Sequence, residues 1–194
     1  MKKLFIPILK DEINLDNLKF PNRFILAYSI QYEKTAKSLK KKFGKRVKIM
    51  QVLGCSKLKS NLPIVILADG NFHALNLALQ NKIVYKIEKN KLKKFDKKLL
   101  EKYQKRIKAG TARFLYSDKI GIIVSIKPGQ EQLNLALSLK KKLKKKSYVF
   151  LTNNINTSEF ENFPLDIYVN TACPTIIYDS SKIINYKEIE KLRL

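Results

Sequence analysis

The stretch Phe24-Ile25-Leu26-Ala27-Tyr28-Ser29-Ile30 decides the fold of this chain. It is a continuous apolar run of β-prone residues, which is typical of a strand that is buried on both faces. A helical segment is predicted from about Glu33 to Phe43, ending at Gly44. A buried strand followed by a helix predicts a parallel sheet with helices packed on it.

The same alternation of strands and helices extends over the rest of the chain. Strands are predicted at residues 47–53, 64–68 and 83–87, with a short helix at 72–79. A lysine-rich segment at 86–108 has apolar residues at helical spacing and is predicted to connect two units. The pattern then restarts, with strands predicted at 120–126, 147–151 and 166–170 and helices at 129–143 and near 158–162.

Similarity between the two halves of the chain indicates an internal duplication. Residues 25–31 and 38–45 resemble residues 122–127 and 138–145, and the predicted order of elements is the same in both halves. The predicted fold class is therefore α/β, with two related small domains at residues 1–108 and 109–194. Each domain is expected to contain a parallel sheet of about four strands flanked by helices.

The composition predicts a soluble protein of the cytoplasm. The chain has 194 residues, of which 45% are hydrophobic, and this is enough to build a core. The apolar run at the N-terminus stops at Lys10, too short for a signal peptide. No apolar run approaches the roughly 18 residues that a membrane helix needs, so no membrane partner is expected.

The formal net charge of +24 is a feature of many proteins that bind nucleic acids or other polyanions. Only five of the 40 basic residues are Arg, however, although Arg is the better bidentate ligand of phosphate. A direct RNA contact therefore stays open but is not favoured. Solvated lysine faces on helices are the simpler explanation of the charge.

The two cysteines of the chain, Cys55 and Cys173, are the first candidates for chemistry. Each follows the C-terminal end of a predicted strand, which is the sheet edge where α/β proteins bind ligands. Gly54 precedes the first thiol and lets the backbone turn and approach a bound group closely. Pro174 follows the second thiol, and proline after a cysteine is common around iron-sulfur ligands. A disulfide is not expected in a reducing compartment, so a ligand role and a buried thiol both remain open.

Two further segments place polar groups at the same kind of strand end. His73 is the only histidine and lies in the first turn of a predicted helix, where an anion is favoured. The turn that begins at Lys127 and ends at Gln130 enters another predicted helix. The residues alone thus predict a duplicated α/β protein with candidate site residues on one sheet edge, and they do not identify a reaction.

Five short motifs occur in a fixed order along the chain: Tyr28-Ser29-Ile30-Gln31-Tyr32, Gln51-Val52-Leu53-Gly54-Cys55, Asp69-Gly70-Asn71-Phe72-His73, Lys127-Pro128-Gly129-Gln130 and Val169-Asn170-Thr171-Ala172-Cys173-Pro174. Together they resemble the diphthamide synthase family of archaea and eukaryotes. The last motif is the most specific of the five, and the resemblance covers almost the whole chain.

The resemblance implies three related α/β domains, each of which gives one cysteine to a central [4Fe-4S] cluster that also binds S-adenosylmethionine. It implies that Cys55 and Cys173 are the ligands from the second and third domains. The implied reaction transfers a 3-amino-3-carboxypropyl group from S-adenosylmethionine to a histidine of translation elongation factor 2 by radical chemistry. Motif positions suggest that Gln31, Lys127 and Gln130 hydrogen-bond the co-substrate and that His73 supports the pocket.

The chain also departs from the family pattern. Residues 1–108 and 109–194 correspond to the second and third domains, while the first domain and its cysteine are not found, so we expect a partner protein to supply them. Homo-oligomers and hetero-oligomers both remain open. Thr175 stands where the family usually has an arginine. The alternative functions are a non-catalytic or electron-delivery partner of the enzyme and a basic RNA- or ribosome-binding module without a cluster.

Overall fold

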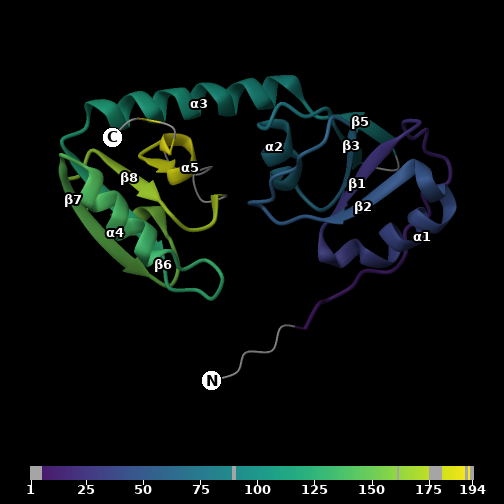
Figure 1. The fold of residues 1–194 in the computed structure, drawn as a ribbon, viewed down its shortest axis with the longest axis horizontal. Coiled ribbons are helices and arrows are strands. Elements are labelled where there is room, and N and C mark those ends of the chain that lie inside the picture. The colour runs from purple at the N-terminus through teal and green to yellow at the C-terminus, as the bar shows by residue number, and fades with distance from the viewer. Residues whose placement is uncertain (1–5, 89–90, 161, 175–180, 191, 193–194) are drawn as a thin grey trace. The chain divides into compact units, whose positions relative to one another are not determined.

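A computed structural model describes residues 6–88, 91–160, 162–174, 181–190 and 192 of the chain (Figure 1). Contacts divide the chain into two compact units, Met1–Leu100 and Glu101–Leu194. The division falls inside helix α3 (Lys97–Tyr116), whereas the sequence places the domain boundary after residue 108. The difference arises because the first turn of α3 contributes Leu100 to the core of the first unit.

The first unit is built on a sheet with the order β2-β1-β3-β4-β5 within its described residues. The first four strands in this order pair in parallel, and β5 pairs antiparallel with β4. The strands are β1 (Phe24–Tyr28), β2 (Val47–Gln51), β3 (Ile64–Leu67), β4 (Val84–Glu88) and β5 (Lys91–Lys94), and the helices are α1 (Glu33–Phe43), α2 (Phe72–Ala78) and the short 3-10 turns η1 (Ile30–Tyr32) and η2 (Gly44–Arg46).

Strand β1 is buried on both faces, as its continuous apolar sequence predicts. Phe24, Leu26 and Tyr28 belong to one core cluster, which includes Ala36 and Leu39 of α1. The alternate residues Ile25 and Ala27 belong to a second cluster with α2 on the opposite face. This arrangement follows from the alternation of side chains along a strand. The sheet is therefore covered by helices on both faces.

The second unit repeats the same topology. Its described sheet has the order β7-β6-β8-β9 with every pair parallel, which corresponds strand for strand to β2-β1-β3-β4. The shared order supports an internal duplication. The elements are β6 (Lys119–Ser125), α4 (Leu133–Lys142), β7 (Lys146–Thr152), the 3-10 turn η3 (Thr157–Phe160), β8 (Ile167–Asn170), β9 (Ile183–Asn185) and α5 (Tyr186–Ile189).

The two faces of the second sheet are covered differently. Ile122 and Val124 of β6 pack in a cluster with Phe114 of α3 and Ala136 of α4, and Figure 1 shows α4 alongside the sheet. On the other face, Ile123 packs with Phe160 and the buried ring of Tyr168. The second core is thus closed by helices on one face and by the η3 segment on the other.

The structure corrects the predicted elements at four places. Strand β5 is antiparallel and lies where the sequence predicts the start of a helix, because its lysines give no strand-like alternation. Helix α4 begins at Leu133 rather than near Gly129. Strand β9 and helix α5 are missing from the sequence prediction because each is only three or four residues long. No helix among the described residues is long and apolar enough to cross a bilayer.

The strand order fixes where a ligand is expected in each unit. In open α/β sheets, the crevice lies beyond the C-terminal ends of the two strands at which the chain changes direction across the sheet. Those strands are β1 and β3 in the first unit and β6 and β8 in the second. The loops after these four strands, together with the loop after β2, carry the five sequence motifs.

Candidate functional site

The loop that carries Cys55 follows β2 and exposes the thiol to solvent. The loop is a tight turn, because the Ser56 amide donates a hydrogen bond to the Leu53 carbonyl oxygen over 3.1 Å. The Leu53 amide donates in return to Ser56 Oγ over 2.8 Å. These paired hydrogen bonds hold the backbone on both sides of Cys55 in one conformation.

Helix α2 anchors this turn from the side. The side-chain amides of Asn76 and Gln80 both donate to the Ser56 carbonyl oxygen, over 3.2 and 2.9 Å. The Phe72 ring lies against Gly54, where a Cβ atom would come within 2.0 Å of the ring. Gly54 is therefore required by the close approach of an aromatic ring and not by backbone dihedral angles. The Cys55 loop and α2 form one packed structure.

His73 lies next to Phe72 in the first turn of α2, with the two ring centroids 5.0 Å apart. Its Nδ1 atom is buried and has no hydrogen-bond partner among the described residues. Burial lowers the pKa of His73, because desolvation disfavours the charged imidazolium. His73 is thus neutral near pH 7 and presents an unpaired ring nitrogen beside the loop of Cys55.

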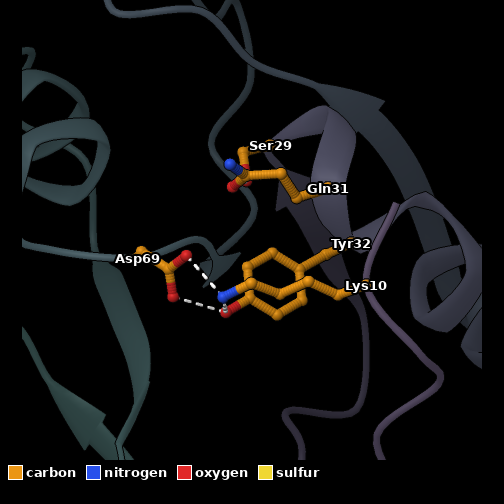
Figure 2. A network of polar contacts seen from close by, with 5 residues as sticks. All are labelled: Lys10, Ser29, Gln31, Tyr32 and Asp69. Atoms are coloured by element: carbon orange, nitrogen blue, oxygen red, sulfur yellow. Dashed lines mark hydrogen bonds and ion pairs between the residues drawn. The ribbon is translucent and has the colours of Figure 1, made fainter. Parts of the chain in front are cut away.

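A polar network links Lys10, Tyr32 and Asp69 near the C-terminal ends of β1 and β3 in the first unit (Figure 2). The Tyr32 hydroxyl donates to Asp69 Oδ1 over 2.5 Å, and Lys10 Nζ donates to Asp69 Oδ2 over 2.7 Å. Lys10 Nζ also lies 3.1 Å from the Tyr32 hydroxyl oxygen. Hydrogen bonding from Lys10 and then from Tyr32 lowers the pKa of Asp69, so this carboxylate stays ionised. The network joins the segment before β1 to the loop after β3.

Gln31 belongs to the neighbourhood of this network, as Figure 2 shows. Its side-chain oxygen accepts a hydrogen bond from Ser29 Oγ over 3.3 Å, and its carbonyl oxygen accepts one from the Lys10 amide over 2.7 Å. The Gln31 side chain is otherwise exposed. It is available to a ligand, while the backbone around it is fixed.

In the second unit, Lys127 and Gln130 form the two ends of one turn. The Gln130 amide donates to the Lys127 carbonyl oxygen over 3.0 Å, and Gly129 has a φ of +77°. Proline followed by a glycine with positive φ is the pattern of a type II turn. The Lys127 amide donates to the buried Ser125 Oγ over 3.2 Å. Both side chains are half-buried in a loop whose shape is set by its backbone.

The loop of Cys173 follows β8 and is anchored by buried polar side chains. Asn170 donates from Nδ2 to the Cys173 carbonyl oxygen over 2.8 Å and accepts at Oδ1 from the Ala172 amide over 3.0 Å. Thr171 Oγ1 donates to the Ile123 carbonyl oxygen of β6 over 2.8 Å. The Cys173 loop is therefore fixed beside the C-terminal end of β6.

Asn185 completes this anchoring from strand β9. Its Oδ1 accepts from Asn170 Nδ2 over 2.9 Å, and its Nδ2 donates to the Pro174 carbonyl oxygen over 3.1 Å. Asn170 and Asn185 are register partners and are only 2% and 4% exposed. Buried amides are tolerated only when their hydrogen bonds are made, so this pair defines the path of the chain on both sides of Cys173.

The sequence identifies the thiol-bearing loops but misses several of the residues that hold them. Asn76 and Gln80 belong to no motif, and Asn185 lies in a strand too short to predict. Lys10 gives no signal because it precedes the first strand, whereas Tyr32 and Asp69 stand inside two of the motifs without an assigned role. Thr175 lies outside the described residues.

The thiols are the donors on which a metal site in this chain would depend. Neither Cys55 nor Cys173 forms a disulfide in the described part of the chain. Among those residues, no group of three or more His, Cys, Asp or Glu side chains is arranged to hold a metal ion. Thiolates are soft ligands that suit iron-sulfur clusters. Each unit therefore offers one thiol on an anchored loop, and a cluster needs at least one further ligand.

Comparison with known proteins first gives a family and a curated relative. The family model of putative diphthamide synthesis proteins matches residues 9–190. The 2-(3-amino-3-carboxypropyl)histidine synthase of Pyrococcus horikoshii is 31% identical over 153 residues, which are 73% of this chain and 45% of that protein. The chain thus spans about half the length of this curated relative.

Solved structures from the same organism share the fold. The crystal structure of Dph2 from Pyrococcus horikoshii matches with a TM-score of 0.76 and 28% identity, over 88% of this chain and 57% of that one. The crystal structure of Dph2 with a 4Fe-4S cluster matches with a TM-score of 0.74 and 27% identity, over 88% and 56%. Both likenesses confirm the predicted α/β fold class.

We predict that Asn185→Ala lowers the free energy of unfolding by about 2–3 kcal/mol. The change removes the hydrogen-bond donor of the Pro174 carbonyl oxygen. It also removes the oxygen that accepts a hydrogen bond from Asn170 Nδ2, and both bonds lie in a buried site. Urea unfolding followed by circular dichroism measures the effect. Asn153→Ala, at an exposed position of the same unit, serves as the control and changes stability by less than about 0.5 kcal/mol. Equal effects of the two changes would contradict the anchoring role.

We predict that His73 titrates with a pKa below the ordinary value of 6.5 in the folded protein. The unfolded chain then binds a proton at His73 more tightly than the folded protein does. The free energy of unfolding therefore falls as the pH drops below the ordinary value of 6.5. Proton NMR reads the midpoint directly, because the chain has one histidine. Unfolding at about pH 7.5 and about pH 5.5 should show a larger loss of stability in the wild type than in His73→Gln. A midpoint at the ordinary value of 6.5 would mean that the His73 ring lies in solvent, and one above it would mean that the ring has an acidic partner.

Proposed function

Because this chain belongs to the diphthamide synthesis protein family, we propose that it takes part in forming 2-(3-amino-3-carboxypropyl)histidine. In this proposal, Cys55 and Cys173 are two ligands of a [4Fe-4S] cluster. The substrates are S-adenosylmethionine and a histidine of translation elongation factor 2, and the reaction takes place in the cytoplasm. The observation that carries the proposal is that each of the two duplicated units ends a strand in an anchored loop with one thiol.

The donor set of the chain fits two of the ligands of such a cluster. Cys55 is exposed and Cys173 half-buried, and hydrogen bonds to the neighbouring backbone hold both loops. A ligand loop that is already ordered loses little conformational entropy when it binds. A solved relative contains a 4Fe-4S cluster, which supports the choice of cofactor.

The third thiolate comes from outside residues 1–194, because the chain has two cysteines. We propose that a partner polypeptide supplies it, on a unit related to the two described here. Residues 1–108 and 109–194 then correspond to the second and third domains of the family. The partner and this chain form a hetero-oligomer in which the cluster is completed. Such assembly would make cluster binding depend on the partner.

When bound, the cluster would supply the electron that cleaves S-adenosylmethionine between its sulfur and the γ-carbon and thereby provides the transferred group. The chain's own polar residues would orient the co-substrate. Lys127 offers an ammonium group for a carboxylate, while Gln31 and Gln130 offer amides for ribose or carboxylate oxygens. All three side chains extend from turns with fixed backbones.

His73 has a different role in this proposal. It is neutral, packs on Phe72 and leaves its buried Nδ1 atom unpaired among the described residues. A neutral ring supports the loop of Cys55 without adding positive charge to a site that must accommodate a sulfonium ion.

Iron and sulfide content after anaerobic reconstitution tests the proposal. We expect about four iron atoms per complex when the chain is mixed with a protein that carries the related unit and the third cysteine, and a much lower content for the chain alone. Cys55→Ser and Cys173→Ser should each abolish stable binding in the mixture, because one ligand is then missing. The visible absorption spectrum gives the same result independently of the iron assay.

Lys57→Ser is the matched control, because it introduces serine at an exposed position two residues from Cys55. This variant should bind iron as the wild type does. If both cysteine variants retained a full cluster in the mixture, the ligands would lie elsewhere and the assignment would be wrong. If no mixture bound iron, the proposal that this protein holds a cluster would be wrong.

A further inference from the structure

A basic corner lies at the end of the second unit where strands β6 and β7 begin. We use the name basic corner for Tyr116, Lys119, Lys141, Lys144, Lys146 and Tyr148. The corner is at the N-terminal ends of the strands, whereas the loop of Cys173 follows the C-terminal end of β8 in the same parallel sheet. It is therefore separate from the loop of Cys173, and a ligand at the corner is independent of the proposed function.

Hydrogen bonds bring the parts of the basic corner together. Lys145 Nζ donates to the carbonyl oxygens of Phe114 and Leu115, over 3.0 and 2.6 Å, at the C-terminal end of α3. The Lys146 amide donates to the Asp118 carbonyl oxygen over 3.1 Å. These contacts fix the α4–β7 connection against the end of α3, and Figure 1 shows the two segments adjacent in this unit. The lysines around Lys145 are thus held on an ordered surface.

The positive charge of this corner is concentrated. Six of the seven residues from Lys140 to Lys146 are lysine, and no acidic residue lies between Glu131 and Glu159. Within the described part of the chain, no ion pair engages the ammonium groups of Lys141, Lys144 or Lys146. The surface carries charge that a ligand with negative charge would neutralise.

The lysines of α1 provide a contrast within the same chain. Lys34, Lys37 and Lys42 each form an ion pair, with Asp11, Glu33 and Asp16 respectively. A general excess of lysine therefore does not by itself leave lysines unpaired.

Two acids do lie near the basic corner, Asp118 and Asp166. Asp166 accepts hydrogen bonds from the backbone amides of Lys119 and Asp118, and these bonds lower its pKa. Its carboxylate is therefore engaged by the backbone at the start of β6. The corner keeps an excess of positive charge even with both acids counted.

Two lysines of the corner repel each other in the sheet. Lys119 and Lys146 are register partners at the start of the parallel pair β6 and β7, and both are exposed. Like charges on neighbouring strands are destabilising. An anion that binds between them relieves this repulsion, so the arrangement is more favourable with a polyanion bound than without one.

Exposed tyrosines accompany these lysines. Tyr116 is 89% exposed at the last residue of α3, and Tyr148 is 49% exposed on the edge strand β7, two residues beyond Lys146. Aromatic rings that are open to solvent beside a row of lysines are the arrangement on which unpaired bases stack while phosphates contact the cations. An acidic protein surface would not use the exposed rings. In a duplex the bases are stacked on one another, so their faces are not available to the tyrosines.

We propose that the basic corner binds single-stranded nucleic acid without sequence preference, with Lys119, Lys141, Lys144 and Lys146 on phosphates and Tyr116 and Tyr148 under bases. The inference rests on ordered, unpaired lysines, on the repulsion between Lys119 and Lys146, and on the two exposed rings. Its ligand is a polynucleotide of either sugar, because the corner has no feature that distinguishes them.

Binding of a fluorescein-labelled oligouridylate to the intact chain, measured by anisotropy over a range of salt concentrations, tests the proposal. The triple variant Lys141→Gln, Lys144→Gln, Lys146→Gln removes three phosphate contacts. The slope of log affinity against log salt should then fall by about 2, and the affinity at about 0.1 M salt by about 100-fold. Lys145 is left unchanged because it supports the end of α3.

Matched variants separate this surface from net charge. Lys34→Gln, Lys37→Gln, Lys42→Gln removes the same charge from α1 and should change the affinity by less than about threefold, since those lysines are ion-paired. Tyr116→Ala should weaken binding about tenfold, whereas Tyr116→Phe should not. An oligothymidylate that binds as tightly as the oligouridylate supports the proposal.

Four results would overturn the proposal. Equal losses in the two lysine triples would show that net charge alone attracts the probe. Unchanged binding in Tyr116→Ala would show that no base stacks on that ring. Equal binding of duplex RNA would show that the ligand is not recognised as a single strand. Polyglutamate that binds as tightly as the oligonucleotide, with the same dependence on Lys141, Lys144 and Lys146, would identify an acidic protein as the partner.

Discussion

The parallel pairing of one fully buried central strand is the constraint on which the rest of each unit depends. Strand β1 lies between β2 and β3, and β6 lies between β7 and β8. Because all of these neighbours are parallel, their C-terminal ends meet at one edge of each sheet. At that edge the chain leaves each strand through a loop before it enters the helix that packs on the sheet. The loops that carry the thiols and the other motif residues are therefore placed by the core.

The duplicated scaffold places different chemistry at equivalent positions. The loop after β3 holds Asp69 in an ion pair with Lys10, while the equivalent loop after β8 holds Cys173. The first unit instead carries its thiol after β2, where the side-chain amides of Asn76 in α2 and of Gln80 just after it secure the turn. The two loops thus reach a similar degree of order through unrelated hydrogen bonds. This divergence explains why symmetry between the halves does not predict the position of the second thiol.

The order of the elements and the thiol-bearing loops could be predicted because they depend on local patterns. Apolar runs indicate β1 and β6, and Gly44 marks the end of α1. The features that the sequence does not show depend on contacts between distant segments. Asn185 meets Asn170 only because β9 pairs with β8, and Lys10 meets Asp69 only because a segment before β1 reaches the loop after β3. Neither contact can be recognised from the residues that neighbour it in the sequence.

Family membership and the geometry of the loops both bear on the proposed function. Each unit carries one thiol on an anchored loop, and the chain spans about half of its curated relative. In each unit the backbone around the candidate site residues is already fixed by hydrogen bonds, at Gln31 in the first and at Lys127 in the second. In the proposed function, such order reduces the entropy lost when the remaining cluster ligand arrives with another protein.

Alkylation of the cysteines, read by mass spectrometry before and after cluster loading in the presence of the partner, tests the central claim most directly. If Cys55 and Cys173 are both cluster ligands, iodoacetamide should modify each of them in the cluster-free complex and neither in the loaded one, because iron occupies the thiolates. Modification of either cysteine at the same rate in both states would contradict the claim.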